Sequence, residues 1–267
     1  MIVIIVQFVK TKSTNMNYTT DVNDSQWKII KKFLDTKRKR QHDLRRIWNA
    51  IQYILKTGCQ WRMLPKNFAP WSVVYYYYRR WKYAGVMELM LEEVTYRIRK
   101  AMGKKGQPTA CVIDSQSIKT TSVGGFCLGY DAGKKTKGRK RHIAVDTMGN
   151  LLTVDVHSAS LNDRDMGCEV LSKAKEKYPA LAISFADGGY SGRLEQTVQN
   201  KLNIGLKIVK KIRDGFHVLP KRWIVERTFA WINNDRRNAK DYEYSPLTSE
   251  TMIQLSMIRL GLNRIFK

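Results

Sequence analysis

The order of strands and helices expected after residue 108 constrains the fold more than any other feature of the sequence. An apolar, β-rich run at 109–114 comes first, and the alternating stretch at 142–160 has a Met-Gly-Asn turn that predicts a hairpin. Helix, strand, helix, strand and two further helices then follow. Hairpin strands pair antiparallel, whereas strands joined through helices pair parallel. The order therefore predicts an α/β fold with a mixed five-stranded sheet flanked by helices, the layout of a ribonuclease-H-like domain.

The preceding residues form a separate all-α, helix-turn-helix-like module. Asn23-Asp24-Ser25 can cap a first helix, and a second begins at Asp43 and ends at Gly58. An unusually aromatic helix at 71–81 and a helix from 86 to about 101 follow. The loops are longer than those of a true helix-turn-helix motif. We divide the chain into a flexible arm (1–22), a helical module (23–101), a Gly/Pro/Lys linker (102–108) and a second domain (109–267).

The first residues contain a run of apolar side chains that ends at Lys10. The run lacks the basic start and the cleavage site of a signal peptide, and it is too short to span a bilayer. We therefore expect no membrane partner. Met16 resembles a natural start, so residues 1–15 are expected to be upstream read-through or a flexible arm.

The charge balance indicates a polyanionic partner. Lys and Arg number 48 against 23 Asp and Glu, a formal net charge of +25. Such an excess attracts nucleic acid, although a merely soluble or ribosome-like basic protein is the alternative. The four cysteines are scattered and form neither a zinc pattern nor a disulfide framework, which suits a reducing cytosol.

Three acids are the candidate catalytic residues. Asp114 and Asp187 each end an expected strand, and these strands are neighbours in a ribonuclease-H-like sheet. Glu226 lies in the first turns of the helix that follows, free to project toward the strand ends. Three unpaired carboxylates would repel one another without a cation, and oxygen ligands suit Mg²⁺, with Mn²⁺ as a substitute. Two such ions about 4 Å apart would activate a water or a 3′-hydroxyl. For Asp187 alone, a helix cap is the alternative interpretation.

Basic residues in three regions are expected to contact DNA. The aromatic helix carries cations among its rings, which suits phosphate contacts and stacking, although the same rings could form a core face. The stretch 133–140 fails as a phosphate-binding loop and is interpreted as a basic loop that touches DNA. The residues are Arg79, Arg80, Lys82, Lys137, Arg139, Lys140, Arg222, Arg227, Arg236 and Arg237.

Other polar residues have structural interpretations. Asp163 is interpreted as the cap of the helix that starts there, and Asp146 and Asp155 as turn or solvent-face acids. His142 and His157 could be ligands, but histidines in strands are more often structural.

Several blocks of the sequence resemble the insertion-sequence DDE transposases, in particular the IS-five group. The similarity runs from about residue 24 to 267 and rests on "ILKTGCQWRMLPKNFAPWSVVYYYYRRW", "VIDSQSIKT", "KGRKRHIAVDTMGNLL", "SASLNDRD", "FADGGYSG", "LPKRWIVERTFAWI" and "DYE". The resemblance implies a ribonuclease-H-like catalytic domain with the triad Asp114, Asp187 and Glu226. The separation of 39 residues between the last two is too short for an inserted domain.

The chain departs from a signature of the wider family, Tyr-x-x-Arg-x-x-x-Glu-x(6)-Lys. Arg222 matches the Arg position, but Leu219 stands at the Tyr position and Asn233 at the Lys position. The basic residue that would hold the terminal phosphate is therefore open among Arg222, Arg227, Arg236 and Arg237.

The resemblance implies a Mg²⁺-dependent transposase that binds terminal inverted repeats, cleaves the element's ends and joins their 3′-OH groups to target DNA. Its partners would be double-stranded DNA and, because two ends must be held together, a second copy of the chain. We expect such a protein in the cytoplasm of a prokaryotic cell, on the nucleoid. The alternatives are a non-catalytic DNA-binding protein, such as an inactive transposase copy, and a simple hydrolytic nuclease.

Overall fold

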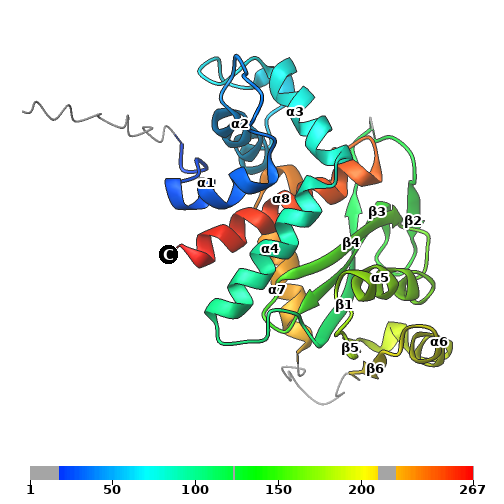
Figure 1. Cartoon of the computed structure of the whole chain (residues 1–267). Coiled ribbons are helices and arrows are strands. Elements are labelled where there is room, and N and C mark those ends of the chain that lie inside the picture. The colour runs from blue at the N-terminus through cyan, green and yellow to red at the C-terminus, as the bar shows by residue number, and fades with distance from the viewer. Residues whose placement is uncertain (1–17, 123, 210–220, 267) are drawn as a thin grey trace, which may run out of the picture.

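The computed structural model describes residues 18–122, 124–209 and 221–266 (Figure 1). Its front part is helical, as the sequence predicts. Asn23 and Gln26 form a capping box at the first helix, Asp43 caps the second, and Gly58 ends it with a left-handed φ of 71°. The elements are α1 (Asp24–Ile30), η1 (Lys31–Phe33), α2 (Leu44–Thr57), η2 (Trp61–Met63), α3 (Trp71–Tyr83) and α4 (Val86–Ala101).

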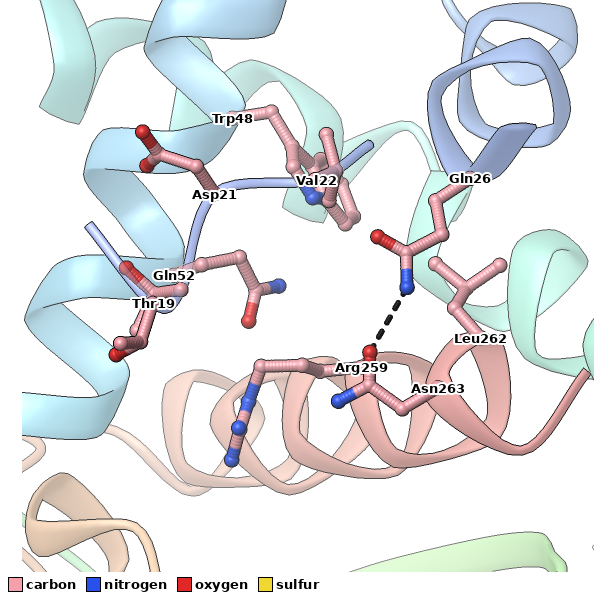
Figure 2. A pocket seen from close by; sticks show the side chains of 10 residues that line it. Thr19, Asp21, Val22, Gln26, Trp48, Gln52, Arg259, Leu262 and Asn263 are labelled. Atoms are coloured by element: carbon pink, nitrogen blue, oxygen red, sulfur yellow. Dashed lines mark hydrogen bonds between the residues drawn. The ribbon is translucent and has the colours of Figure 1, made fainter. Parts of the chain in front are cut away.

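The N-terminal segment is ordered closer to the start than the sequence indicates. Tyr18 and Val22 fall within the expected flexible arm, but the Tyr18 ring stacks on Phe68 at 5.1 Å and Val22 is buried. The Val22 N–H also donates to Asn49 Oδ1 at 3.1 Å. Figure 2 shows this segment against α2 and the last helix, beside a cavity of about 20 Å³. The arm's boundary is therefore corrected, and residues 1–17 lie outside the described residues.

The sheet has the predicted mixed topology. In the described residues its main order is β4-β3-β1-β5-β6, in which β1 pairs antiparallel with β3 and parallel with β5. The short β2 pairs with the beginning of β3 as a sixth strand. The strands are β1 (Ala110–Lys119), β2 (Gly129–Asp131), β3 (Thr136–Asp146), β4 (Leu151–Ser158), β5 (Ile183–Ala186) and β6 (Gly205–Ile208). The fold is that of a ribonuclease-H-like domain behind a helical module.

Helices cover both faces of the sheet (Figure 1). Consecutive residues of a strand point to opposite faces. Cys111 and Ile113 of β1 pack with α5 and α6, while Val112 packs with the cluster that contains α7 and α8. The remaining helices are α5 (Asp163–Lys177), η3 (Gly188–Tyr190), α6 (Arg193–Leu202), α7 (Arg222–Asn233), η4 (Arg236–Asn238) and α8 (Pro246–Ile265).

The helical module and the sheet share one hydrophobic core. A single cluster of buried side chains runs from Val22 to Leu262 and includes residues of α2, α4, β3 and α8. Gly261 of α8 lies so close to α4 that an added Cβ would come within 2.3 Å of Val94 Cγ1. The linker therefore joins two parts of one packed body. None of the described helices combines the length and apolarity needed to cross a membrane.

Two strands extend beyond their expected limits. Because β1 continues to Lys119, Asp114 lies within this strand rather than at its end. Because β3 begins at Thr136, the expected basic loop at 133–140 is largely a strand, and its side chains alternate between the two faces.

Candidate active site

The sheet register brings Asp114 and Asp187 side by side. The parallel pairing of β1 with β5 ends at Val112 opposite Phe185, and each acid lies two residues beyond that pair. A two-residue step returns the side chain to the same face of the strand, which here is the face covered by α7. The β1 strand continues past this point to Lys119, whereas β5 stops at Ala186.

The environment of Asp114 disfavours its charged form. Burial, which is the largest effect, together with the neighbouring carboxylate of Asp187 raises the pKa of Asp114 from 3.8 to about 6, against a lowering by the Ser115 N–H. That N–H donates to Asp114 Oδ1 at 2.7 Å. Lys134 and Arg222 offset part of the increase. Asp114 is therefore a carboxylate without a full counter-charge.

The two oxygens of Asp187 have different partners. Oδ1 accepts a hydrogen bond from the Gly189 N–H at 2.9 Å, so Asp187 caps the short helix η3. Oδ2 lies 3.4 Å from Nη2 of Arg222 on α7. Asp187 can therefore cap η3 through Oδ1 while Oδ2 remains available to the candidate site.

Arg222 links the second acid to the third. Its Nε lies 3.2 Å from Glu226 Oε1, one turn further along α7, where i and i+4 side chains share a face. The Glu226 side chain is 57% exposed, which makes it the most exposed of the three acids. One guanidinium thus stands between Asp187 and Glu226.

The donor set fits a hard divalent cation in its chemistry. All three candidate ligands are carboxylates, and two of them already hold a cation, the guanidinium of Arg222, between them. Within residues 18–122, 124–209 and 221–266, however, no three His, Cys, Asp or Glu side chains stand close enough to hold one ion as they are placed. Glu226 would have to exchange Arg222 for the ion.

A buried polar network supports the acids from the other face of β1. Ser115 Oγ donates to Asp163 Oδ1 at 2.7 Å, and Lys140 Nζ lies 2.9 Å from the same oxygen. Asp163 therefore holds β1 and β3 rather than capping α5, whose N-cap Asn162 makes no side-chain cap bond. The His142 ring, as predicted for a structural residue, is fully buried, and burial lowers its pKa to about 3.

Tyr190 fixes the turn that carries Asp187. Its hydroxyl lies 2.7 Å from His142 Nε2, and its side chain is fully buried. The turn 188–190 is thereby fastened to β3, and the Gly189 N–H of the same turn holds Asp187. Tyr190 stands within the glycine-rich stretch that follows β5, but sequence reasoning assigned it no role.

Lys134 is a second residue that sequence reasoning missed. Its Nζ donates to the Ser115 carbonyl at 3.1 Å, immediately after Asp114 in β1. The side chain is exposed, and its charge lowers the pKa of Asp114. The basic run at 133–140 was a signal for it, but only the pairing of β2 with β3 shows which lysine reaches the acids.

Two of the residues expected to contact DNA are buried, and those expectations are wrong. Arg139 is fully buried, pairs with Asp241 at 3.1 Å and donates to three carbonyl oxygens. Lys140 is 6% exposed, and its Nζ donates to the Leu161 carbonyl besides pairing with Asp163. The physical reason is the early start of β3, which turns these side chains inward. Lys137 of the same run is exposed.

The cations around α7 and η4 are held to different degrees. The Arg227 guanidinium lies 4.4 Å from the ring centroids of both Trp223 and Trp231, and burial lowers its pKa. Arg237 pairs with Glu243 at 2.6 Å, while Arg236 is exposed. Asn233, which stands at the Lys position of the family signature, contacts Gln116 and the buried Arg141. Leu219 lies outside the described residues.

The cations of α3 also differ in their surroundings. Arg79 and Arg80 are exposed, and Arg80 lies 3.9 Å from Asp35. Lys82 donates to Thr248 Oγ1 at 2.9 Å and lies over the Tyr83 ring at 4.5 Å. All three remain candidates for phosphate contacts.

Comparison with known families gives two matches. The family model described as "Putative transposase of IS4/5 family" matches residues 22–91, which is most of the helical module. The model described as "Transposase DDE domain" matches residues 105–260, more than half of the chain, and contains all three acids. No curated protein matches the chain.

Proposed function

We propose a function on the premise that the chain belongs to the DDE transposase family, as the match to more than half of its length shows. The proposed protein is the transposase of an insertion sequence. It binds the terminal inverted repeats of its element, cleaves the DNA at their ends and transfers the 3′-OH ends into target DNA. Asp114, Asp187 and Glu226 are its proposed catalytic residues.

The observation that carries the proposal is the juxtaposition of Asp114 and Asp187. These carboxylates lie on one face of two neighbouring strands, and burial, together with the nearby charge of Asp187, raises the pKa of Asp114. A structural role would pair or protonate such acids. The buried Asp114, which has no full counter-charge, supports the proposal that a cation and a phosphate bind here.

The three acids would hold Mg²⁺, or Mn²⁺ in its place. When bound, the ions supply activation of a water or 3′-hydroxyl and charge stabilisation at the phosphodiester. The protein positions the three carboxylates. Tyr190 and Gly189 hold the turn and the side chain of Asp187, and the Ser115 N–H holds Asp114. Glu226 would approach from α7. Once Glu226 turns to the ion, Arg222 is proposed to contact a phosphate of the DNA.

The helical module is the proposed reader of the repeats. Arg79 and Arg80 project from α3 into solvent, and the formal net charge of +25 favours DNA over other partners. Further DNA contacts are proposed for Arg222 and Arg227 of α7, Arg236 and Arg237 of η4, and Lys137 of β3. Two ends held together require at least a dimer on DNA, and such a protein would act on the nucleoid of a prokaryotic cell.

The test is cleavage and joining of a labelled DNA that carries the element's own end, by wild type and Asp187→Asn in Mg²⁺. Asparagine keeps an oxygen for the Gly189 N–H, so this variant removes the charge and leaves the cap. We expect the variant to bind DNA as wild type does but neither to cut nor to join it. Full activity of Asp187→Asn would overturn the assignment of the triad. Binding without cutting by wild type would favour a non-catalytic DNA-binding protein.

A further inference from the structure

A pocket lies between the helical module and the segment that leads into α8, apart from the three acids. Its volume is about 350 Å³. Trp61 of η2 and Trp71 and Tyr75 of α3 line it from the module, and Glu243 and Tyr244 line it from the segment before α8. Nothing in the proposed cleavage reaction uses these side chains.

The pocket is rich in aromatic side chains that remain accessible. Trp71 and Tyr75 are each 37% exposed, and Tyr244 is 70% exposed. The Trp61 ring is held by Tyr75 and Tyr78, with ring centroids 5.0 and 5.1 Å away. Rings held by one another and open on one side form a rigid surface on which another flat ring can stack.

The charge at the pocket is positive. Arg62 lines it, lies over the Trp71 ring at 5.4 Å and is exposed. Glu243, the one carboxylate among the lining residues, is already neutralised by Arg237 at 2.6 Å. A neighbouring cation and open rings together match a base attached to a phosphate.

We propose that this pocket takes one unpaired nucleobase of the bound DNA. The base stacks on the rings of Trp71 and Tyr75, and Arg62 contacts the adjoining phosphate. The inference rests on the proposed function, since it assumes that the helical module binds the element's ends. Without DNA, a second copy of the chain is a poorer occupant, because two chains of net charge +25 repel each other.

The experiment compares the affinities of fully paired and singly mismatched duplexes of the element's end, without Mg²⁺. The mismatch is moved along the repeat, so every duplex has the same number of phosphates. A mismatched base leaves the stack at lower cost. We expect one mismatch position to bind wild type about tenfold more tightly, the factor that corresponds to about 1.4 kcal/mol of stacking.

Tyr75→Ala and Trp71→Ala test the pocket, and Tyr76→Ala is the matched control. Tyr76 neighbours Tyr75 on α3 and is 57% exposed, but it does not line the pocket. We expect both pocket variants to lose the mismatch preference and keep the affinity for paired DNA, while Tyr76→Ala keeps both. Circular dichroism identifies a pocket variant that fails to fold. In that case the mismatch preference of the other pocket variant tests the inference.

The outcomes separate the pocket from the proposed function. The inference is overturned if paired repeat DNA is bound but no mismatch position is preferred, or if the preference survives in both pocket variants. Failure of wild type to distinguish repeat DNA from unrelated DNA would instead overturn the proposed function. Sedimentation without DNA covers the remaining case: a wild-type dimer that Tyr75→Ala abolishes would assign the pocket to a second copy.

Discussion

The two faces of β1 hold polar side chains under opposite conditions. On the face toward α7, Asp114 lies beside another carboxylate, and its pKa is raised to about 6. On the face toward α5, Ser115 belongs to a buried network in which Asp163 is bonded to both Ser115 and Lys140. Adjacent residues of one strand thus belong to an unsatisfied and a satisfied cluster. The difference supports the proposal that the acids bind a ligand, whereas the network stabilises the fold.

The largest expected effect is on activity, from Asp114→Asn. The substitution removes a proposed metal ligand and with it several kcal/mol of charge stabilisation, so cleavage should fall about a thousandfold or more. Stability should change in the opposite direction. The pKa of Asp114 is raised from 3.8 to about 6 in the folded state. Protonated Asp114 therefore stabilises the fold fully below pH 3.8, and this stabilisation is lost as the pH rises through about 6.

Removing the charge should therefore raise the free energy of unfolding at pH 7, by about 1–3 kcal/mol. Urea unfolding at pH 4 and pH 7 measures this, with wild type and variant converging at the lower pH. A variant that is less stable at both pH values would show that Asp114 is a structural acid.

Arg139→Met tests a buried charge that, unlike Asp114, is fully paired. The substitution leaves Asp241 buried without its partner, which should cost about 3–5 kcal/mol of unfolding free energy. Lys137→Met is the control, because Lys137 is exposed on the same strand and should change stability by less than about 0.5 kcal/mol. Equal effects in urea unfolding would contradict the inward placement of Arg139.

Tyr190→Phe tests the residue that links the buried network, through His142, to the turn that carries Asp187. The variant loses the hydrogen bond to His142, which should cost about 1–3 kcal/mol of stability. Because the same turn carries Asp187, we expect kcat to fall several-fold while KM for DNA stays constant. Tyr130→Phe, at an exposed tyrosine, is the control. A loss of stability with unchanged kcat would limit Tyr190 to the fold.

Lys134→Ala should have the smallest effect, on the pH dependence of cleavage. The Lys134 charge lowers the pKa of Asp114, so its removal raises that pKa further. We expect the acidic limb of the pH–rate profile to shift upward, with Lys135→Ala unchanged as the neighbouring exposed control. The same shift in both variants would indicate a general effect of charge.

The strand order and the juxtaposition of Asp114 and Asp187 could be predicted because they depend on local patterns. The apolar run before Asp114 and the glycines after Asp187 are visible in the sequence, and parallel strands bring such ends together. The burial of Arg139 and Lys140 could not be predicted, because it depends on where β3 begins and on the partner Asp241, about a hundred residues away. The roles of Tyr190 and Lys134 depend likewise on pairing between distant strands.

The central claim is that Asp114, Asp187 and Glu226 together hold divalent cations. The most direct measurement replaces Mg²⁺ by Fe²⁺ and generates hydroxyl radicals, which cut the protein chain beside the bound metal. The account predicts fragments that end near residues 114, 187 and 226, that disappear when Mg²⁺ competes and that are absent from Asp187→Asn. Uniform cutting, or cuts clustered elsewhere in the chain, would contradict it.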